Sequence, residues 1–182
     1  MKTVNDIWPH LQYLDQRFFA VINYLQLRIA DKTIVDLDCG DARILKHMLP
    51  LGANGKYIGN DVLESPYWGG VADRYLKHTE FYLKKDSEME FEKVDILMSW
   101  GIGGYELSDE SVESSTLTES IKRIADKHDP KFIVLEAIWD FDSILEGLVK
   151  YFSNRYITRI DERLQLKEIR EYKRHVILLE KL

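Results

Sequence analysis

The sequence has 182 residues, a length that fits one domain able to bury about 70% of its unfolded surface without support from disulfides or metals. Hydrophobic residues make up 45% and charged residues 31%, and the one cysteine, Cys39, excludes an internal disulfide and fits a reducing compartment. The net charge of −6 argues against a protein that grips a long nucleic acid, because such proteins usually carry a basic surface.

No run of eighteen apolar residues is present, and residues 1–12 are too polar for a signal peptide, so we expect a cytoplasmic protein with no membrane partner. The sequence also has no internal repeat, no low-complexity segment and no linker rich in Pro, Gly or Ser. We therefore treat residues 1–182 as a single domain, made of an N-terminal helical segment (1–31) and a core (32–182).

The first predicted element is a helix with one apolar stripe, because apolar residues recur at intervals of three or four. These residues are Ile7, Leu11, Leu14, Phe18, Ile22, Leu25 and Ile29.

After residue 32, short apolar runs alternate with helical periods, which predicts strands and helices in turn. The expected strands cover residues 33–37, 56–62, 80–84, 94–100 and 131–138. The expected helices cover residues 41–49, 65–76, 110–128 and 141–152, and a glycine-rich loop covers residues 101–109. Two extended runs, at residues 156–166 and 172–179, close the chain as an antiparallel hairpin. The pattern predicts an α/β fold with a Rossmann-like, doubly wound, mostly parallel seven-stranded sheet and a C-terminal antiparallel hairpin.

In open α/β sheets ligands bind beyond the carboxyl ends of the strands, so the residues at those ends form the candidate site. The turn after the first expected strand contains Asp36, Asp38 and Asp41 and lacks the G-x-G-x-x-G pattern, so it would repel a pyrophosphate. An acid-rich turn suits a ligand with positive charge instead. Asp61 ends the second strand about 20 residues later, the spacing at which an acid meets ribose hydroxyls in nucleotide-binding folds.

The segment IVDLDCGDARIL resembles the first motif of class I S-adenosylmethionine-dependent methyltransferases, whose usual form is V-L-D-x-G-x-G-x-G. In this alignment Asp36 matches the acid at the strand end and Gly40 matches the central glycine. Asp61 matches the acid that ends the family's second strand. The run KKDSEMEFEKVDILMSW resembles the stretch in which an acid, here Asp86, precedes the fourth strand. The resemblance covers residues 33–182 and implies the family's closing hairpin, with the N-terminal helix as a lid over the cofactor.

The resemblance implies that residues 32–182 form a cofactor-binding core, that the cofactor is S-adenosylmethionine, and that the reaction is methyl transfer. Asp36 or Asp38 would pair with the cofactor's ammonium group. Asp61 would accept hydrogen bonds from the ribose hydroxyls, and Asp86 would accept one from the adenine amino group. The residues expected to line the cofactor are Asp36, Asp38, Cys39, Gly40, Asp61, Val62, Asp86, Ser87 and Ser99.

Two positions depart from the family motif: Asp38 stands where the first glycine belongs, and Ala42 where the third belongs. Asp38 adds a Cβ atom and a charge where the backbone passes close to the cofactor. A second hypothesis is therefore a catalytically degenerate cofactor-binding domain that acts as a partner or regulatory subunit. A third, a nicotinamide-dependent dehydrogenase, would share the sheet, but the phosphate-binding turn that it needs is missing here.

Three aromatic residues, Trp100, Tyr105 and Tyr67, are the candidates for substrate binding. They lie on or near the loops that should flank the methyl group, and aromatic rings stack on planar groups or enclose cations. The Asn-Pro-Pro-Tyr signature of enzymes that methylate amino groups of bases is missing after the fourth strand, where Ser-Trp-Gly-Ile stands. Together with the acidic charge, this favours a small-molecule acceptor over a nucleic acid.

No catalytic base is identified, because methyl transfer from a sulfonium depends mainly on aligning the two reactants. Cys39 is expected to be a small buried residue rather than a nucleophile. The five histidines show no metal-ligand spacing, so no metal site is predicted.

Overall fold

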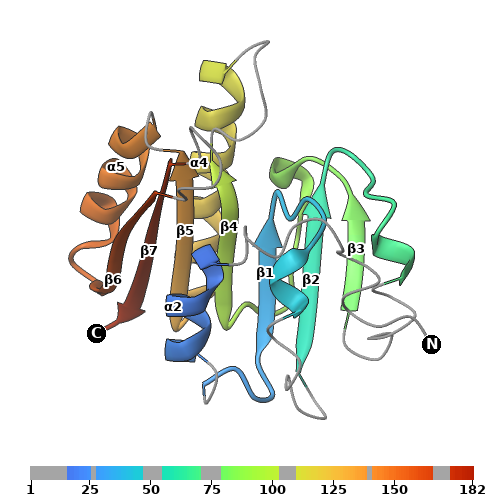
Figure 1. Ribbon diagram of the computed structural model, residues 1–182, viewed down its shortest axis with the longest axis horizontal. Coiled ribbons are helices and arrows are strands. Elements are labelled where there is room, and N and C mark those ends of the chain that lie inside the picture. The colour runs from blue at the N-terminus through green and yellow to red at the C-terminus, as the bar shows by residue number, and fades with distance from the viewer. Residues whose placement is uncertain are drawn as a thin grey trace.

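One seven-stranded sheet, in the order β3-β2-β1-β4-β5-β7-β6, organises the molecule (Figure 1). The structure is a computed structural model, and it describes residues 16–25, 28–46, 55–70, 79–102, 110–138, 141–165 and 173–182. The strands are β1 Thr33–Leu37, β2 Lys56–Asp61, β3 Thr79–Leu83, β4 Ile96–Ile102, β5 Phe132–Ile138, β6 Tyr156–Gln165 and β7 Lys173–Lys181. Strands β1 to β5 run parallel, and β7 pairs antiparallel with both β5 and β6. The mostly parallel sheet and its closing antiparallel hairpin, as predicted from the sequence, are therefore confirmed.

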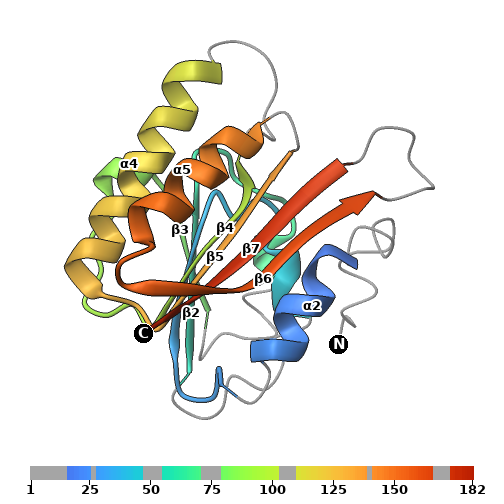
Figure 2. The ribbon, with the colours of Figure 1, turned by 90° about the vertical axis from the view of Figure 1, so that its left-hand side faces the viewer.

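Helices cover both faces of this sheet. Helix α2 (Gln16–Leu25) lies on one face, and α4 (Glu110–His128) and α5 (Asp142–Phe152) lie on the other, as the side view in Figure 2 shows. Each face has its own core, because successive side chains of a strand point to opposite faces. The α2 side of the core includes Phe18, Val21, Leu25, Ile34, Tyr57 and Met98, and the other side includes Val35, Leu97, Ile121, Leu145 and Leu148.

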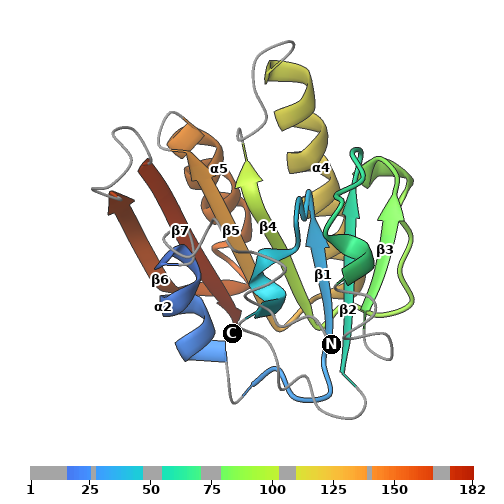
Figure 3. The same ribbon diagram turned by 45° about the vertical axis from the view of Figure 1, so that its right-hand side comes forward.

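The carboxyl ends of the parallel strands lie along one edge of the sheet, which is the upper edge in Figure 1 and is seen from another side in Figure 3. The chain builds β1, β2 and β3 outward in one direction and then returns to place β4 on the other side of β1. Ligands of open α/β sheets bind where the strand order reverses in this way. The fold therefore places the ends of β1, β2 and β4 at the position where a ligand is expected.

The described part of the predicted N-terminal helix is α2, and residues 28–32 that follow it are not helical. Helix α2 ends at Leu25, and Ile29 lies beyond it in a turn closed by the Lys32 N–H, which donates to the Ile29 carbonyl at 3.1 Å. Asp31 in this turn has a left-handed φ of 58°. The apolar period continues past the end of the helix because the turn returns Ile29 to the same core.

The segment predicted as a helix at residues 41–49 is a 3-10 helix, Arg43–Lys46, in its described part. Ala42 has a left-handed φ of 52°, and its carbonyl accepts from the Leu45 N–H at 3.1 Å, three residues later. This geometry winds the chain more tightly than an α-helix does. Of the helix predicted at residues 65–76, the structure describes only the beginning, with residues 68–70 helical.

Strand β4 continues two residues past Trp100 and carries a bulge between Trp100 and Ile102. The loop expected at residues 101–109 therefore begins later than predicted, and residues 103–109 lie outside the described residues. No helix in the part of the chain that the structure describes is both long and apolar enough to cross a membrane.

Candidate functional site at the carboxyl edge of the sheet

The loop that follows β1 has a left-handed backbone at three alternate positions. Asp38, Gly40 and Ala42 have φ angles of 51°, 51° and 52°. These are the three positions that align with the glycines of the family motif, and a left-handed backbone is the reason for glycine in such loops. The loop therefore has a backbone that favours glycine at all three positions, although only Gly40 is a glycine.

Asp61, the last residue of β2, braces this loop. Its Oδ2 atom accepts a hydrogen bond from the Gly40 N–H at 2.9 Å, and its Oδ1 atom accepts one from the Leu63 N–H at 3.0 Å. The side chain is only 2% exposed. A carboxylate has about four acceptor positions, so each oxygen can still accept a further hydrogen bond. The sequence placed Asp61 at the strand end, and the structure brings it against the loop after β1.

Asp36, in β1, is buried and contacts the side chain of Tyr57, in β2. The Tyr57 hydroxyl donates to the Asp36 Oδ2 atom at 2.5 Å. Burial, followed by the nearby charge of Asp36, raises the pKa of Tyr57 well above its ordinary value, so the phenol keeps its proton. The sequence analysis identified Asp36 and missed Tyr57, which stands in an apolar run and looks like an ordinary core aromatic.

Cys39 is buried, as predicted, and its burial together with the surrounding charges disfavours the reactive thiolate. Burial, followed by the charges of Asp36, Asp61 and Asp38, raises the pKa of Cys39 well above its usual range. The thiolate is the nucleophilic form of cysteine, and here it is strongly disfavoured. The same sulfur packs against the backbone of β2, where a Cβ atom added to Gly59 would lie 2.8 Å from Sγ. Only glycine fits this close approach between the loop and β2.

Two side chains from the segment after β2 also hold the loop, and the sequence analysis missed both. The Trp68 Nε1–H donates to the Gly40 carbonyl at 2.8 Å, and the Ser65 hydroxyl donates to Asp41 Oδ1 at 2.6 Å. The Trp68 ring stacks on Phe81 of β3, with 4.8 Å between the ring centroids and 7° between the planes. A tryptophan three residues after a serine gives no sequence signal for this contact, because the contact spans 28 residues.

Asp86 lies in a 3-10 helix, η3 (Asp86–Glu88), beside the end of β2. The Asn60 side-chain amide donates to the Asp86 Oδ1 atom in a short hydrogen bond, and both side chains are buried. Burial raises the pKa of Asp86 to about 6; Asn60 and Arg123 act in the opposite direction, and the charge of Asp61 adds to the increase. Asn60 is the residue that sequence reasoning missed here.

Helix α4 reaches this region through Arg123. Its Nη2 atom donates to the main-chain carbonyls of Asp86 and Met89, at 3.0 and 3.2 Å. Its Nη1 atom lies 3.4 Å from Glu90 Oε1. Arg123 thereby joins α4 to the backbone on both sides of η3 and fixes the position of the Asp86 carboxyl.

The remaining residues predicted to line a cofactor differ in exposure. Val62 and Ser87 are exposed, whereas Ser99 is fully buried in β4. Within the described ranges, the buried side-chain atoms without a hydrogen-bond partner include Asn60 Oδ1, Ser99 Oγ and Trp100 Nε1. Asn60 and Ser99 both pair with Leu37, the last residue of β1, and Trp100 follows Ser99, so a polar ligand or water bound near the end of β1 would satisfy these atoms.

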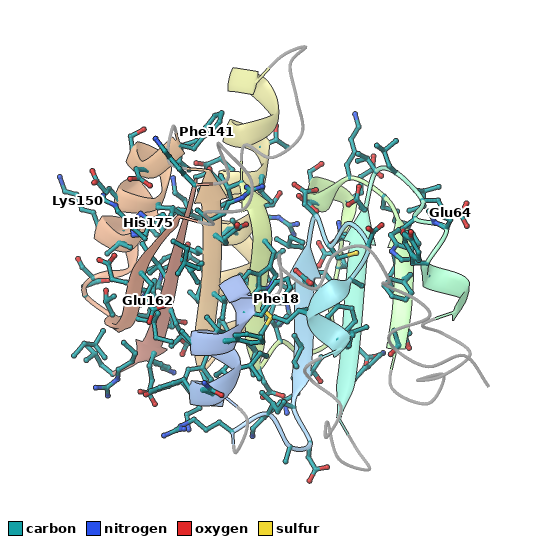
Figure 4. The ribbon with its side chains drawn as sticks, viewed as in Figure 1. Phe18, Glu64, Phe141, Lys150, Glu162 and His175 are labelled. Carbon is teal, nitrogen blue, oxygen red and sulfur yellow. The ribbon has the colours of Figure 1, made fainter. Side chains whose placement is uncertain are left out.

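The candidates for substrate binding lie in different surroundings. Trp100 was expected to end the fourth strand beside the following loop, but it lies inside β4, which continues to Ile102, and it is only 7% exposed. Its ring packs edge-on against Phe18 of α2, with the centroids 4.7 Å apart (Figure 4). Tyr67 is half-buried and packs against the α2 side of the core. Tyr105 lies outside the described residues.

Two polar clusters with a buried member, Glu136 in one and His175 in the other, lie in β5 and β7, and neither was predicted. Glu136 of β5 is fully buried, and its Oε1 atom lies 3.2 Å from Arg174 Nε. His175 is buried beside α5 (Figure 4), with Nδ1 at 2.9 Å from Asp142 Oδ1 and Nε2 at 2.7 Å from Asp161 Oδ1. A lone glutamate in the apolar run FIVLEAI is the one sequence signal that points to these clusters.

Among the described residues, no group of three or more His, Cys, Asp or Glu side chains is arranged to hold a metal ion. The carboxylates of Asp36, Asp61 and Asp86 each bind donors from the protein itself. The arrangement is an acidic edge that presents hydrogen-bond acceptors to a ligand.

No protein-family model matches the sequence, and no curated protein matches it significantly. Solved structures do match. The structure is similar to 1,6-didemethyltoxoflavin-N1-methyltransferase from Burkholderia thailandensis, with a TM-score of 0.69 and 14% identity, over 97% of this chain and 81% of that chain. It is also similar to magnesium protoporphyrin IX methyltransferase from Synechocystis PCC 6803, with a TM-score of 0.70 and 14% identity, over 100% of this chain and 86% of that chain.

A third similar structure is a putative RNA methyltransferase from Pyrococcus horikoshii, with a TM-score of 0.60 and 12% identity, over 92% of this chain and 80% of that chain. The Burkholderia protein was solved with S-adenosylhomocysteine and the Synechocystis protein with S-adenosylmethionine. The chain has the fold of the class I S-adenosylmethionine-dependent methyltransferases. Proteins of this fold differ in the acceptor that they methylate.

Proposed function

We propose that a chain with this fold and this acidic edge binds S-adenosylmethionine beyond β1 and β2 and transfers its methyl group to a small-molecule acceptor. The observation that carries the proposal is the loop after β1. It keeps a left-handed backbone at all three motif positions, and Asp61 braces it through the Gly40 N–H. Two non-glycine residues in such conformations are costly, and strain of this kind is typical of functional loops.

The chemistry of the edge fits this cofactor. Asp61, with both oxygens able to accept further hydrogen bonds, suits a pair of ribose hydroxyls. Asp86 suits the adenine amino group, and Asp36 suits the ammonium group. The unpartnered atoms of Asn60, Ser99 and Trp100, close to the end of β1, add polar groups that a ligand would satisfy.

Bound S-adenosylmethionine would supply a methyl group on a positively charged sulfonium, which an acceptor atom attacks in line. The protein's own residues then have two tasks, which are to orient the two reactants and to keep water away. The carboxylates Asp36, Asp61 and Asp86 hold the cofactor, and the bonds from Gly40, Asn60 and Tyr57 fix the direction of each carboxylate. No residue has to remove a proton before the methyl group is transferred to a neutral amine.

A small molecule is the acceptor that we favour. The net charge of −6 and the carboxylates of the edge would repel a polyanion such as RNA. Two of the similar structures described above are named for small-molecule acceptors. The aromatic residues Trp100 and Tyr67 stay the candidates for acceptor contacts.

Calorimetric titration with S-adenosylmethionine and S-adenosylhomocysteine tests the cofactor site. We expect micromolar binding, lost in Asp61→Ala because the ribose acceptor and the brace of the loop disappear together. Asp95→Ala is the matched control. Asp95 also accepts from a backbone N–H, that of Thr33 at 2.8 Å, but at the opposite end of β1. Absence of binding by the wild-type protein would refute the proposal.

The alternative of a degenerate binding domain is favoured by one observation, the charged Asp38 at a motif glycine position. It predicts binding without turnover. A screen of small amine, hydroxyl and thiol compounds, with S-adenosylhomocysteine production as the signal, separates the two functions.

A further inference from the structure

Tyr57 is a fully buried tyrosine whose hydroxyl is used in an unusual way for a core residue. A buried tyrosine hydroxyl normally finds a partner, and a main-chain carbonyl is sufficient. Tyr156 shows this ordinary arrangement, since its hydroxyl donates to the Pro130 carbonyl at 2.8 Å. Tyr57 instead donates to the carboxylate of Asp36, at 2.5 Å, and Asp36 is only 1% exposed.

This contact brings an ionisable group and a neutral donor together in an acidic environment. The charges of Asp36, Asp38 and Asp61 all act on Cys39, so these carboxylates lie near one another. Burial and neighbouring negative charges both disfavour an ionised carboxylate, whereas a hydrogen bond to the charged form favours it. The high pKa of Tyr57 keeps the proton on the phenol, so the hydroxyl remains a donor throughout the physiological range of pH.

We infer that Tyr57 is a positioning residue for the amino-acid end of the cofactor, because its hydroxyl donates to the buried Asp36 carboxylate and fixes its direction for an ammonium group. The inference rests on the proposed function. It also extends the proposed function, because it predicts that Tyr57, a core residue of β2, affects binding of the amino-acid end of the ligand and not of the nucleoside. A tyrosine that merely packed in the core would affect every ligand of the site equally.

Two ligands separate these roles: S-adenosylhomocysteine carries the ammonium group, and 5′-methylthioadenosine has the same nucleoside but no amino-acid end. We would measure the dissociation constants of both by calorimetry for the wild-type protein, Tyr57→Phe and the control Tyr156→Phe. A hydrogen bond to a charged group is strong, so Tyr57→Phe should bind S-adenosylhomocysteine about tenfold more weakly, or worse, and methylthioadenosine within about twofold of the wild type. Tyr156→Phe should leave both constants unchanged.

Asp36→Asn provides the second test and keeps the inference falsifiable if Tyr57→Phe does not fold. It should show the same selective loss of S-adenosylhomocysteine, and adding Tyr57→Phe to it should cause little further loss. Equal weakening of both ligands by Tyr57→Phe, or unchanged S-adenosylhomocysteine binding by either folded variant, would overturn the inference alone. A wild-type protein that bound neither ligand would overturn the proposed function and this inference with it.

Discussion

The carboxyl group of Asp86, which we propose accepts a hydrogen bond from the adenine amino group, titrates close to neutral pH. Burial raises its pKa to about 6, so the group is partly protonated in the folded protein at mildly acid pH. A raised carboxyl pKa means that the folded state favours the proton. The contribution of Asp86 to the free energy of unfolding is therefore largest below its unfolded pKa of about 3.9 and is lost as the pH rises through about 6.

Cofactor binding should show the opposite dependence on pH. If the ionised Asp86 accepts from the adenine amino group, the dissociation constant for S-adenosylhomocysteine should rise as the pH falls below about 6, approaching tenfold per unit. Titrations between pH 5 and pH 8 measure this. Asp86→Asn, which can still contact Asn60, should bind more weakly at pH 8 and lose the pH dependence. The same dependence in the variant would show that another group is responsible.

The left-handed residues of the loop after β1 offer a test by stability. Ala42 has a φ of 52°, a conformation that disfavours every residue with a Cβ atom. Ala42→Gly should therefore change the free energy of unfolding by less than about 0.5 kcal/mol, since the relief of strain offsets the added entropy of the unfolded chain and the loss of a buried methyl group. Urea unfolding measures the difference. Ala125→Gly, inside α4, should instead lower the free energy by about 1 kcal/mol or more, and an equally large loss of stability in Ala42→Gly would contradict the strain argument.

At the scale of elements, Arg123 connects α4 to η3. It donates to the carbonyls of Asp86 and Met89, so removal of its side chain frees the segment that carries Asp86. Arg123→Ala should weaken binding of S-adenosylhomocysteine about threefold to tenfold, at a cost in stability of about 1 kcal/mol. Lys122→Ala is the control, because Lys122 is next to Arg123 on α4 but contacts Glu119, three residues earlier, and the Tyr151 ring, and neither contact reaches η3. Equal affinity in the two variants would exclude a role for α4 in the position of Asp86.

His175 connects β7 to helix α5 and to strand β6. Its ring nitrogens contact Asp142, at the start of α5, and Asp161, on β6. His175→Ala leaves the two carboxylates without this partner and a gap in the interior, so we expect a loss of about 2–3 kcal/mol in the free energy of unfolding. Lys181→Ala, which removes an exposed ion pair with Asp129 at the other end of β7, should change it by less than about 1 kcal/mol. A similar small loss in both variants would show that the His175 contacts do not stabilise the hairpin.

Elements could be predicted from the sequence where the period of apolar residues is long or where a run is apolar on both faces. Helix α4 occupies the predicted residues, and β5 differs by one residue at its start. The segment after β1 could not, because its tight 3-10 turn depends on the left-handed Ala42, and alanine gives no signal for that conformation. Ile29 caused the opposite error. It is an apolar core residue in a turn, and its spacing made the predicted N-terminal helix too long at its carboxyl end.

At the scale of the whole molecule, the position of the acidic residues of the candidate site could be predicted, because strand ends of a parallel sheet meet at one edge. Asp36, Asp61 and Asp86 belong to three separate segments and come together for this reason. Their partners could not be predicted. Each partner forms its hydrogen bond with a residue far away in the sequence: Tyr57 with Asp36 across 21 residues, Asn60 with Asp86 across 26, and Trp68 with Gly40 across 28. In the sequence, these three residues look like ordinary core or loop residues.

A bound ligand should raise the stability of the entire domain. A ligand that binds only the folded state, at a concentration of 100 times its dissociation constant, adds about 2.7 kcal/mol to the free energy of unfolding. For a domain of this size, that corresponds to a rise of about 5–11 °C in the midpoint of thermal unfolding. We expect this rise with S-adenosylhomocysteine and none with NAD, because the acidic loop after β1 repels a pyrophosphate.

Differential scanning fluorimetry with both ligands, repeated with Asp61→Ala and Asp95→Ala, measures the rise in the midpoint. A rise with NAD alone would favour the dehydrogenase alternative. A rise with S-adenosylhomocysteine that persisted in Asp61→Ala would place the ligand away from the end of β2.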